Sequence, residues 1–231
     1  MGGFTFIYSF FFFNIIIFCW FRDIVREGTF EGKHGIFVTN GLKLGMVLFI
    51  ISEIMFFFSF FWAFFHLSLA PSIQLGSIWP PYGIQVFNYK DIPLLNTLIL
   101  LLSGLSVTWS HKESLNNKIK NKKNIFISLI LTIILALIFT CLQILEYIEA
   151  SFTIFDGGYG SIFFLATGFH GFHVLVGTIF LFFCLIRFLK FHFSRKHHLA
   201  FEFAIWYWHF VDVVWLILYL FVYWWSALNI L

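Results

Sequence analysis

Six long apolar segments dominate this sequence of 231 residues. A helix rises about 1.5 Å per residue, so about 20 apolar residues are needed to cross the roughly 30 Å hydrocarbon core of a bilayer. Because a backbone in lipid must satisfy its own hydrogen bonds, we interpret these segments as helices and predict an all-α polytopic membrane bundle with six transmembrane helices. The predicted spans are residues 4–20, 42–69, 93–109, 125–147, 161–189 and 204–227.

The amino-acid composition agrees with a membrane protein. Apolar residues make up 61% of the chain and charged residues 11%, whereas soluble domains average about 45–50% and about 25%. This composition excludes a soluble globular enzyme, a disordered chain and a disulfide scaffold. Cys19, Cys141 and Cys184 lie far apart in apolar segments, which is not the spacing of a zinc site or of a redox-active cysteine pair.

The basic residues indicate the topology. Thirteen of the 14 Lys and Arg residues lie in the three alternate connections between spans or at the adjoining span ends (Lys43 and Arg187), and the other connections contain Lys90 alone. The positive-inside rule places the three basic connections on the matrix or cytoplasmic side, so both termini lie on the opposite side. We predict a single transmembrane domain over residues 1–231, with a leading helix and loop (1–38) and a five-helix bundle (39–231).

Polar residues within the spans are expensive in lipid and therefore mark interactions or function. His170 and His173 lie in one span, and His209 and Asp212 in another, each pair three residues apart and so on one helix face. We interpret these four residues as a polar network that joins helices by hydrogen bonds. Because a haem–copper centre needs more histidines on facing helices, we predict no metal site in this chain.

Glu53 lies about eight residues into the second span, among Ile, Met and Phe neighbours and with no basic residue one turn away. Burial of a carboxyl group without a basic partner favours its protonated form. Two interpretations remain open from the residues. Glu53 is either a protonated carboxyl that donates one hydrogen bond to a neighbouring helix, or a residue that influences proton access.

The two less basic connections differ from each other. Residues 70–93 contain all four prolines of the chain and predict an ordered, non-helical connection. Trp79 and Tyr82 in this segment are typical of an interfacial aromatic belt. Residues 148–160 predict an acidic loop that contains glycine.

Several stretches in order resemble one family, subunit III of cytochrome c oxidase of the mitochondrial type. The resemblance extends from about residue 15 onward, and the Lys-rich segment 112–125 is the least similar part. The similar stretches include RDIVREGTFEGKH (22–34), WPPYGI (79–84), EYIEASFTIFDGGYG (146–160), GFHGFH (168–173) and HLAFEFAIWYWHFVDVVWL (198–216).

The resemblance implies a core subunit of the respiratory terminal oxidase that supports stability and proton uptake. It implies that subunits I and II are partners and carry haem a and copper, while this chain has no cofactor of its own besides structural phospholipids. Accessory subunits are expected partners, and nucleic acid is not. The position that matches Glu53 is the family's carbodiimide-reactive carboxyl. The absence of an Arg-rich, Ser-rich presequence favours a location in the mitochondrial inner membrane with synthesis inside the organelle, and a bacterial plasma membrane is the alternative. Basic connections would then face the matrix and both termini the intermembrane space.

The family has seven helices and a V-shaped cleft that holds phospholipids, whereas this sequence begins at what resembles the second helix. We expect another polypeptide, either a separately encoded fragment or an accessory subunit, to supply a helix beside residues 4–20, and the alternative is that lipid fills this place. The candidate lipid-headgroup residues are Arg22, Arg26, Arg187 and Lys190, since an arginine fork suits a phosphate. The alternatives are the third subunit of a quinol oxidase, and a proton channel or secondary transporter, although no internal repeat supports a transporter.

Overall fold

The computed structural model describes residues 2–73, 76–115, 121–194 and 197–228. Within this part the chain is helical, with no strand, and six helices are long and apolar enough to cross a membrane. The prediction of an all-α bundle with six transmembrane helices is therefore confirmed. The helices are α1 (Gly2–Thr29), α2 (Ile36–Leu69), α3 (Ile92–Leu115), α4 (Asn121–Glu149), α5 (Gly157–Leu189) and α6 (Leu199–Leu218), followed by the π-helix η2 (Tyr219–Trp225) and the short α7 (Ser226–Leu228).

The helices extend beyond the apolar segments from which they were predicted. Helix α1 continues past Trp20 to Thr29, so Arg22 and Arg26 lie in a helix rather than in a loop. Arginine and glutamate are good helix formers, so the hydrocarbon boundary does not end the helix. Helix α5 begins at Gly157, four residues before the predicted start, after Asp156 accepts a hydrogen bond from the backbone N–H of Thr153 (2.6 Å).

The chain divides into two compact units, Met1–Val47 and Leu48–Leu231, so the division falls inside α2. The first unit contains α1 and the beginning of α2. The second unit contains the rest of α2 and all later helices. Lys118, Lys120, Arg195 and Lys196 of the predicted basic connections lie outside the described residues.

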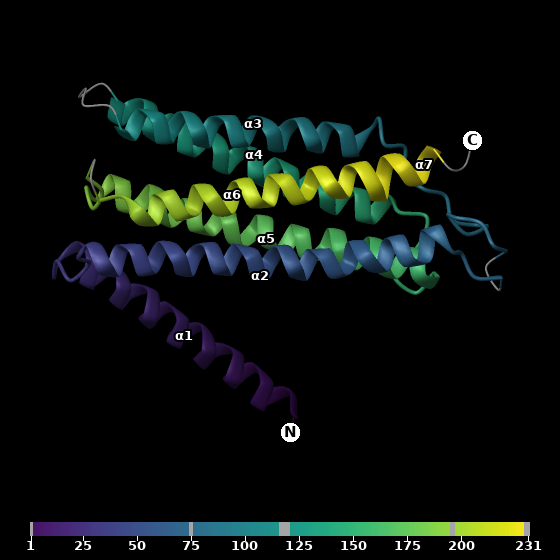
Figure 1. The fold of residues 1–231 in the computed structure, drawn as a ribbon, viewed down its shortest axis with the longest axis horizontal. Coiled ribbons are helices and arrows are strands. Elements are labelled where there is room, and N and C mark those ends of the chain that lie inside the picture. The colour runs from purple at the N-terminus through teal and green to yellow at the C-terminus, as the bar shows by residue number, and fades with distance from the viewer. Residues whose placement is uncertain (1, 74–75, 116–120, 195–196, 229–231) are drawn as a thin grey trace. The chain divides into compact units, whose positions relative to one another are not determined.

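In the second unit, four helices close on one another: α3 packs on α4, α4 on α5, α5 on α6, and α6 on α3 (Figure 1). Small residues let these helices approach closely, as expected where packing rather than hydrophobic burial joins helices. A Cβ atom added at Gly177 of α5 would lie 2.9 Å from Cε3 of Trp208 on α6. The position is therefore restricted to glycine by the indole ring.

Hydrogen bonds between side chains add to this packing. The Trp208 indole N–H donates to Ser103 Oγ (2.9 Å), and the Trp215 indole N–H donates to Thr97 Oγ1 (3.0 Å), which joins α6 to α3 at two levels. Ser106 and Thr132 hydroxyls lie 2.7 Å apart and join α3 to α4. Each of these groups is buried, so its partner removes the penalty for an unsatisfied polar group in an apolar interior.

The proline-containing connection has no helix of more than one turn among its described residues. Tyr82 is exposed, as an interfacial residue should be, but Trp79 is buried. Its ring lies 5.7 Å from that of Phe64 and 5.4 Å from that of Tyr159. The prediction of a belt position is thus wrong for Trp79, because the connection folds back onto the ends of α2 and α5.

Candidate functional site

Glu53 of α2 has a partner that lies 120 positions away along the chain. Its Oε2 atom lies 2.8 Å from Nε2 of His173 on α5. The side chain of His173 is 8% exposed and that of Glu53 is 22% exposed. Glu53 therefore bonds to a neighbouring helix, as one of the two interpretations predicts. Its partner is His173, which the sequence predicts in the polar network with His170, His209 and Asp212.

The second ring nitrogen of His173 determines how protons are distributed in this pair. Nδ1 lies 2.6 Å from the carbonyl oxygen of Phe169, and a carbonyl oxygen can only accept, so Nδ1 carries a hydrogen. A neutral His173 then presents a lone pair at Nε2, and Glu53 must be protonated to donate to it. A charged His173 instead donates to the Glu53 carboxylate. In both cases one proton lies between the two side chains and the pair has no net charge.

Aromatic rings surround the imidazole of His173. The rings of Phe56, Phe57, Tyr207 and Phe210 lie 5.0–6.3 Å from it between centroids. These rings exclude water from the inner side of the hydrogen bond, and in such surroundings an isolated charge is costly. The hydrogen bond between α2 and α5 therefore lies beside an apolar, aromatic surface.

His170, one turn before His173, contacts a different helix. It is 1% exposed, and its Nε2 lies 3.2 Å from the carbonyl oxygen of Val211 on α6. Its ring also stacks at a tilt against Trp215, with centroids 5.1 Å apart. The structure thus directs His170 toward α6 and His173 toward α2, although the two residues share one general face of α5.

His209 and Asp212 of α6 form a local pair that faces α3. Nδ1 of His209 lies 3.6 Å from Oδ2 of Asp212, and Nε2 of His209 lies 3.2 Å from Oγ1 of Thr108. Asp212 packs directly on the backbone of Gly104, where an added Cβ would lie 2.5 Å from Oδ2. This pair therefore joins α6 to α3, whereas the Glu53–His173 pair joins α2 to α5.

One buried polar group was missed by sequence reasoning. Glu146 of α4 is 0% exposed and lies beside Gln143 and Tyr223, which are also buried. Among the described residues, the carboxyl oxygens of Glu146 make no hydrogen bond of standard geometry. The available signal was the three-residue spacing of Gln143 and Glu146, which places both on one helix face.

The candidate lipid-headgroup residues belong to both units and are described separately. In the first unit, Arg22 is exposed and forms an ion pair of 2.8 Å with Asp23. In the second unit, Lys190 is exposed after the end of α5, and the Arg187 guanidinium lies 4.5 Å from the centroid of the Phe193 ring. Cations at the end of a helix suit an interface with lipid phosphates.

A profile of the family "Cytochrome c oxidase subunit III" matches residues 3–227. The chain is 58% identical over 226 residues to cytochrome c oxidase subunit 3 of Chondrus crispus, which covers 98% of this chain and 82% of that protein. It is 60% identical to the subunit of Prototheca wickerhamii (92% and 80% covered) and 60% identical to that of Aedes aegypti (90% and 78% covered).

The profile match extends across all six helices that are long and apolar enough to span a membrane, and across both polar pairs. The resemblance of the sequence to this family is confirmed, and the quinol-oxidase and transporter alternatives are not favoured. A family profile that matches nearly the whole chain and relatives that are 58–60% identical over most of it lead to one conclusion: the chain belongs to the cytochrome c oxidase subunit III family.

Proposed function

We propose that this chain is a core subunit of cytochrome c oxidase that supports proton uptake without carrying a redox centre. It works beside subunits I and II, which hold haem a and copper, in the mitochondrial inner membrane with its basic connections in the matrix. The observation that supports a role in proton uptake is the Glu53–His173 hydrogen bond, a protonatable pair inside an aromatic layer. The protonation of such a pair depends on the local supply of protons and on the field of nearby charges. Its single proton is shared between a side chain of α2 and a side chain of α5.

We further propose that Glu53 tunes proton delivery and does not conduct protons by itself. A conducting path needs a chain of proton donors and acceptors, whereas His173 is enclosed by the four aromatic rings described above. Among the described residues, Glu53 forms its hydrogen bond with His173 of α5. A change in the protonation of this pair therefore acts on α2 and α5 together.

Replacing Glu53 with glutamine tests this role. The glutamine amide retains the shape of the side chain and can still donate to Nε2 of His173, but it cannot release the proton. We expect oxygen consumption by the purified oxidase to fall by a factor of about 2 to 5, equivalent to about 0.4–1 kcal/mol in the activation free energy. Infrared absorption of a protonated carboxylic acid, lost in the Glu53→Gln variant, would place the shared proton on Glu53.

Two comparisons make this test specific. Ser52→Ala lies one residue away on the same helix, outside the pair, and is expected to leave turnover unchanged. Glu53→Leu removes the partner of His173 and is expected to lower turnover more than glutamine does. Complete loss of turnover in Glu53→Gln would show an obligatory relay, and full activity of Glu53→Leu would show that the pair has no role in proton uptake.

We also propose that Lys190 and Arg187 bind the headgroup of a phospholipid at the end of α5. Each cation close to an anionic surface contributes about 1 kcal/mol, so Lys190→Gln is expected to weaken retention of an anionic phospholipid about fivefold. Mass spectrometry of lipid retained by the purified oxidase measures this loss. Lys90→Gln, an exposed lysine in the proline-containing connection, serves as the matched control. Equal lipid retention in both variants would contradict the proposal.

The expectation that a separate chain supplies a helix beside residues 4–20 stays a prediction. Large apolar side chains of α1, such as Phe10 and Phe13, are about three-fifths exposed. Crosslinking from this face in the intact oxidase would identify a neighbouring polypeptide.

A further inference from the structure

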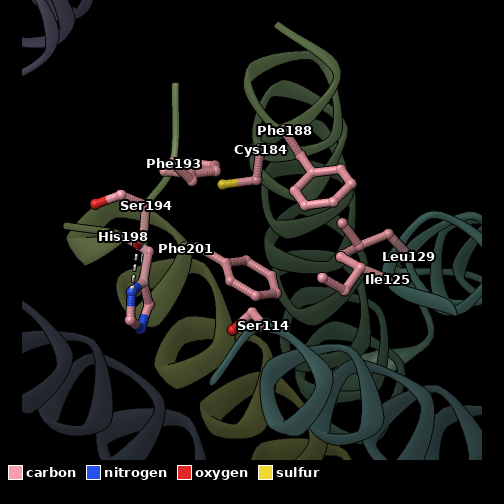
Figure 2. Close-up of a pocket in the computed structure, with 9 residues that line it drawn as sticks. All are labelled: Ser114, Ile125, Leu129, Cys184, Phe188, Phe193, Ser194, His198 and Phe201. Atoms are coloured by element: carbon pink, nitrogen blue, oxygen red, sulfur yellow. Dashed lines mark hydrogen bonds between the residues drawn. The ribbon is translucent and has the colours of Figure 1, made fainter. Parts of the chain in front are cut away.

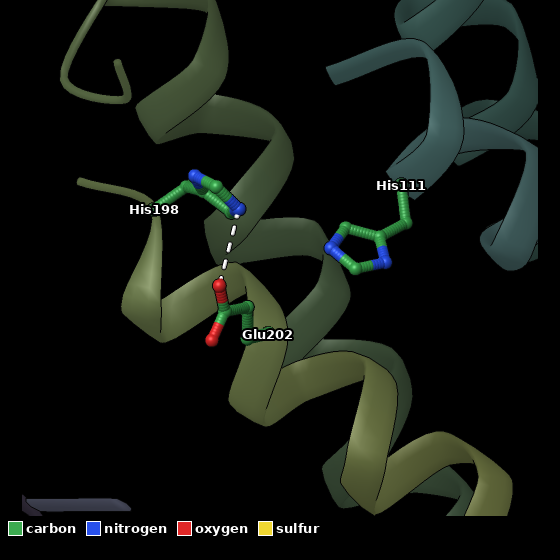
Figure 3. Close-up of side chains that lie close together, drawn as sticks. All are labelled: His111, His198 and Glu202. Carbon is green, nitrogen blue, oxygen red and sulfur yellow. Dashed lines mark ion pairs between the residues drawn. The ribbon is translucent and has the colours of Figure 1, made fainter. Parts of the chain in front are cut away.

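Three side chains of the bundle converge away from the Glu53–His173 pair. His111 lies near the end of α3, His198 precedes the first residue of α6, and Glu202 lies in the first turn of α6. One possible ligand atom from each residue lies within 4.8 Å of the others. Figure 3 shows the two imidazoles and the carboxylate directed toward a common point from two different helices. These three residues are not among the candidates predicted from the sequence, which were the polar residues within the spans.

The orientation of His198 leaves one of its nitrogens available. Nδ1 lies 3.2 Å from the carbonyl oxygen of Ser194, which can only accept, so Nδ1 carries a hydrogen. Nε2 therefore presents a lone pair unless the ring is charged. It faces Oε1 of Glu202 at 3.2 Å, and among the described residues no hydrogen bond of standard geometry reaches it.

A cation is required between these two atoms. The side chain of His198 is 7% exposed and that of Glu202 is 23% exposed, so water screens the contact between the lone pair and the carboxylate only in part. A second proton on His198 would meet this need for the two residues alone. The approach of a third donor, the His111 imidazole, with its ring centroid 5.9 Å from that of His198, favours a metal ion instead.

The donor set matches a particular class of metal. Two imidazoles and one carboxylate, with a water in the fourth position, are typical ligands of zinc in proteins. Ligand atoms on a tetrahedral zinc ion lie about 3.3 Å apart, given bonds of about 2.0–2.1 Å. Glu202 and His198 already have this separation, so His111 needs to approach by at most about 1.5 Å. The Ser194 carbonyl orients His198 as the outer partner of a metal-bound histidine usually does.

A small cavity lies beside one member of the cluster, His198. It has a volume of about 70 Å³, and His198, Ser194 and Ser114 contribute its polar lining, together with apolar side chains such as Phe201 (Figure 2). Liquid water occupies about 30 Å³ per molecule, so about two waters fit beside His198. The structure thus combines three donors and an oriented ring, and the cavity borders His198 among the three.

We propose that His111, His198 and Glu202 form a binding site for a divalent transition metal ion of the zinc class. The ion joins the end of α3 to the beginning of α6, two helices that are distant in the sequence. Binding of the ion would keep the end of α3 and the beginning of α6 close together.

Zinc binding by the purified oxidase tests the site directly. The complex is treated with a chelator, dialysed against buffers of defined free Zn²⁺, and its zinc content per complex is measured by mass spectrometry. We expect wild type to bind one ion more than His111→Ala at low free zinc. We expect Glu202→Gln to weaken that site about 100-fold, at the upper end of the losses seen even for outer-shell changes. X-ray absorption of the added zinc should show two imidazole nitrogens.

Two further variants separate ligation from folding. His197→Ala removes an exposed histidine adjacent to His198 and is expected to bind zinc as wild type does. His111→Cys replaces one zinc ligand by another and should restore the ion that His111→Ala loses. Equal zinc content and affinity in wild type, His111→Ala and Glu202→Gln would overturn the proposal and assign the contact to a protonated His198 paired with Glu202. Because the readout is bound zinc, that result leaves the Glu53 proposal intact.

Discussion

Replacing Trp208 with alanine is expected to destabilise the bundle by about 3–5 kcal/mol, the range for truncating a large buried aromatic side chain. Trp208 is 0% exposed, and its indole packs between α3 and α5. Because helices in lipid associate through close packing, the resulting cavity is not offset by a hydrophobic driving force. Titrating the purified oxidase with a denaturing detergent, while following loss of helical structure in this chain, measures the change.

Trp208→Phe separates the ring from its hydrogen bond. Phenylalanine fills most of the space but does not donate to Ser103 Oγ, so we expect a smaller loss of about 1 kcal/mol. If packing supplies most of the stabilisation, stability should decrease from wild type to Trp208→Phe and then to Trp208→Ala. An alanine variant as stable as wild type would show that Trp208 does not hold α6 against α3 and α5.

Replacing Gly177 with valine is expected to destabilise the protein by about 3 kcal/mol, at the upper end of the usual range for overpacked interiors. Its Cβ would meet Cε3 of Trp208 at 2.9 Å and Cδ1 of Tyr207 at 3.4 Å. Trp208 is held by its hydrogen bond and by complete burial, so α5 must move away from α6. The amount of assembled oxidase and its resistance to denaturing detergent provide the measurement.

Gly171→Ala is the matched control, because it lies on the same helix and an added Cβ there meets no atom within 4 Å. A sharper control uses Trp208 itself. In the Trp208→Ala background the valine at position 177 has a cavity to fill, so its cost should fall well below that in wild type, as expected for two residues in contact. Equal costs in both backgrounds would show that the Gly177 contact with Trp208 is not the cause.

The spans could be predicted from sequence because insertion in lipid depends on each residue's own transfer free energy and on segment length. Helix ends were less predictable. Helix α1 continues through Arg22 and Arg26 because intrahelical hydrogen bonds persist outside the hydrocarbon, where composition no longer marks the helix. Trp79 illustrates the same limit, since its burial depends on how a connection folds over helix ends.

The partners of polar side chains could not be predicted in the same way. The α2 helix is apolar around nearly its whole circumference, so its sequence does not indicate which face contacts α5. Glu53 could be recognised as unusual, but its pairing with His173 depends on the rotation of both helices about their axes. Glu146 and the cluster of His111, His198 and Glu202 were missed for the same reason.

The amino-acid sequence by itself determined the membrane environment, the six helices, the alternation of basic connections and, through its ordered motifs, membership of the subunit III family. Only the tertiary structure decided which polar side chains meet. A side chain at membrane depth carries a local penalty that is visible in the sequence, whereas the partner that relieves the penalty comes from another helix, 120 positions away for Glu53 and His173. Such long-range pairing follows from helix order, rotation and close packing, which are properties of the assembled bundle.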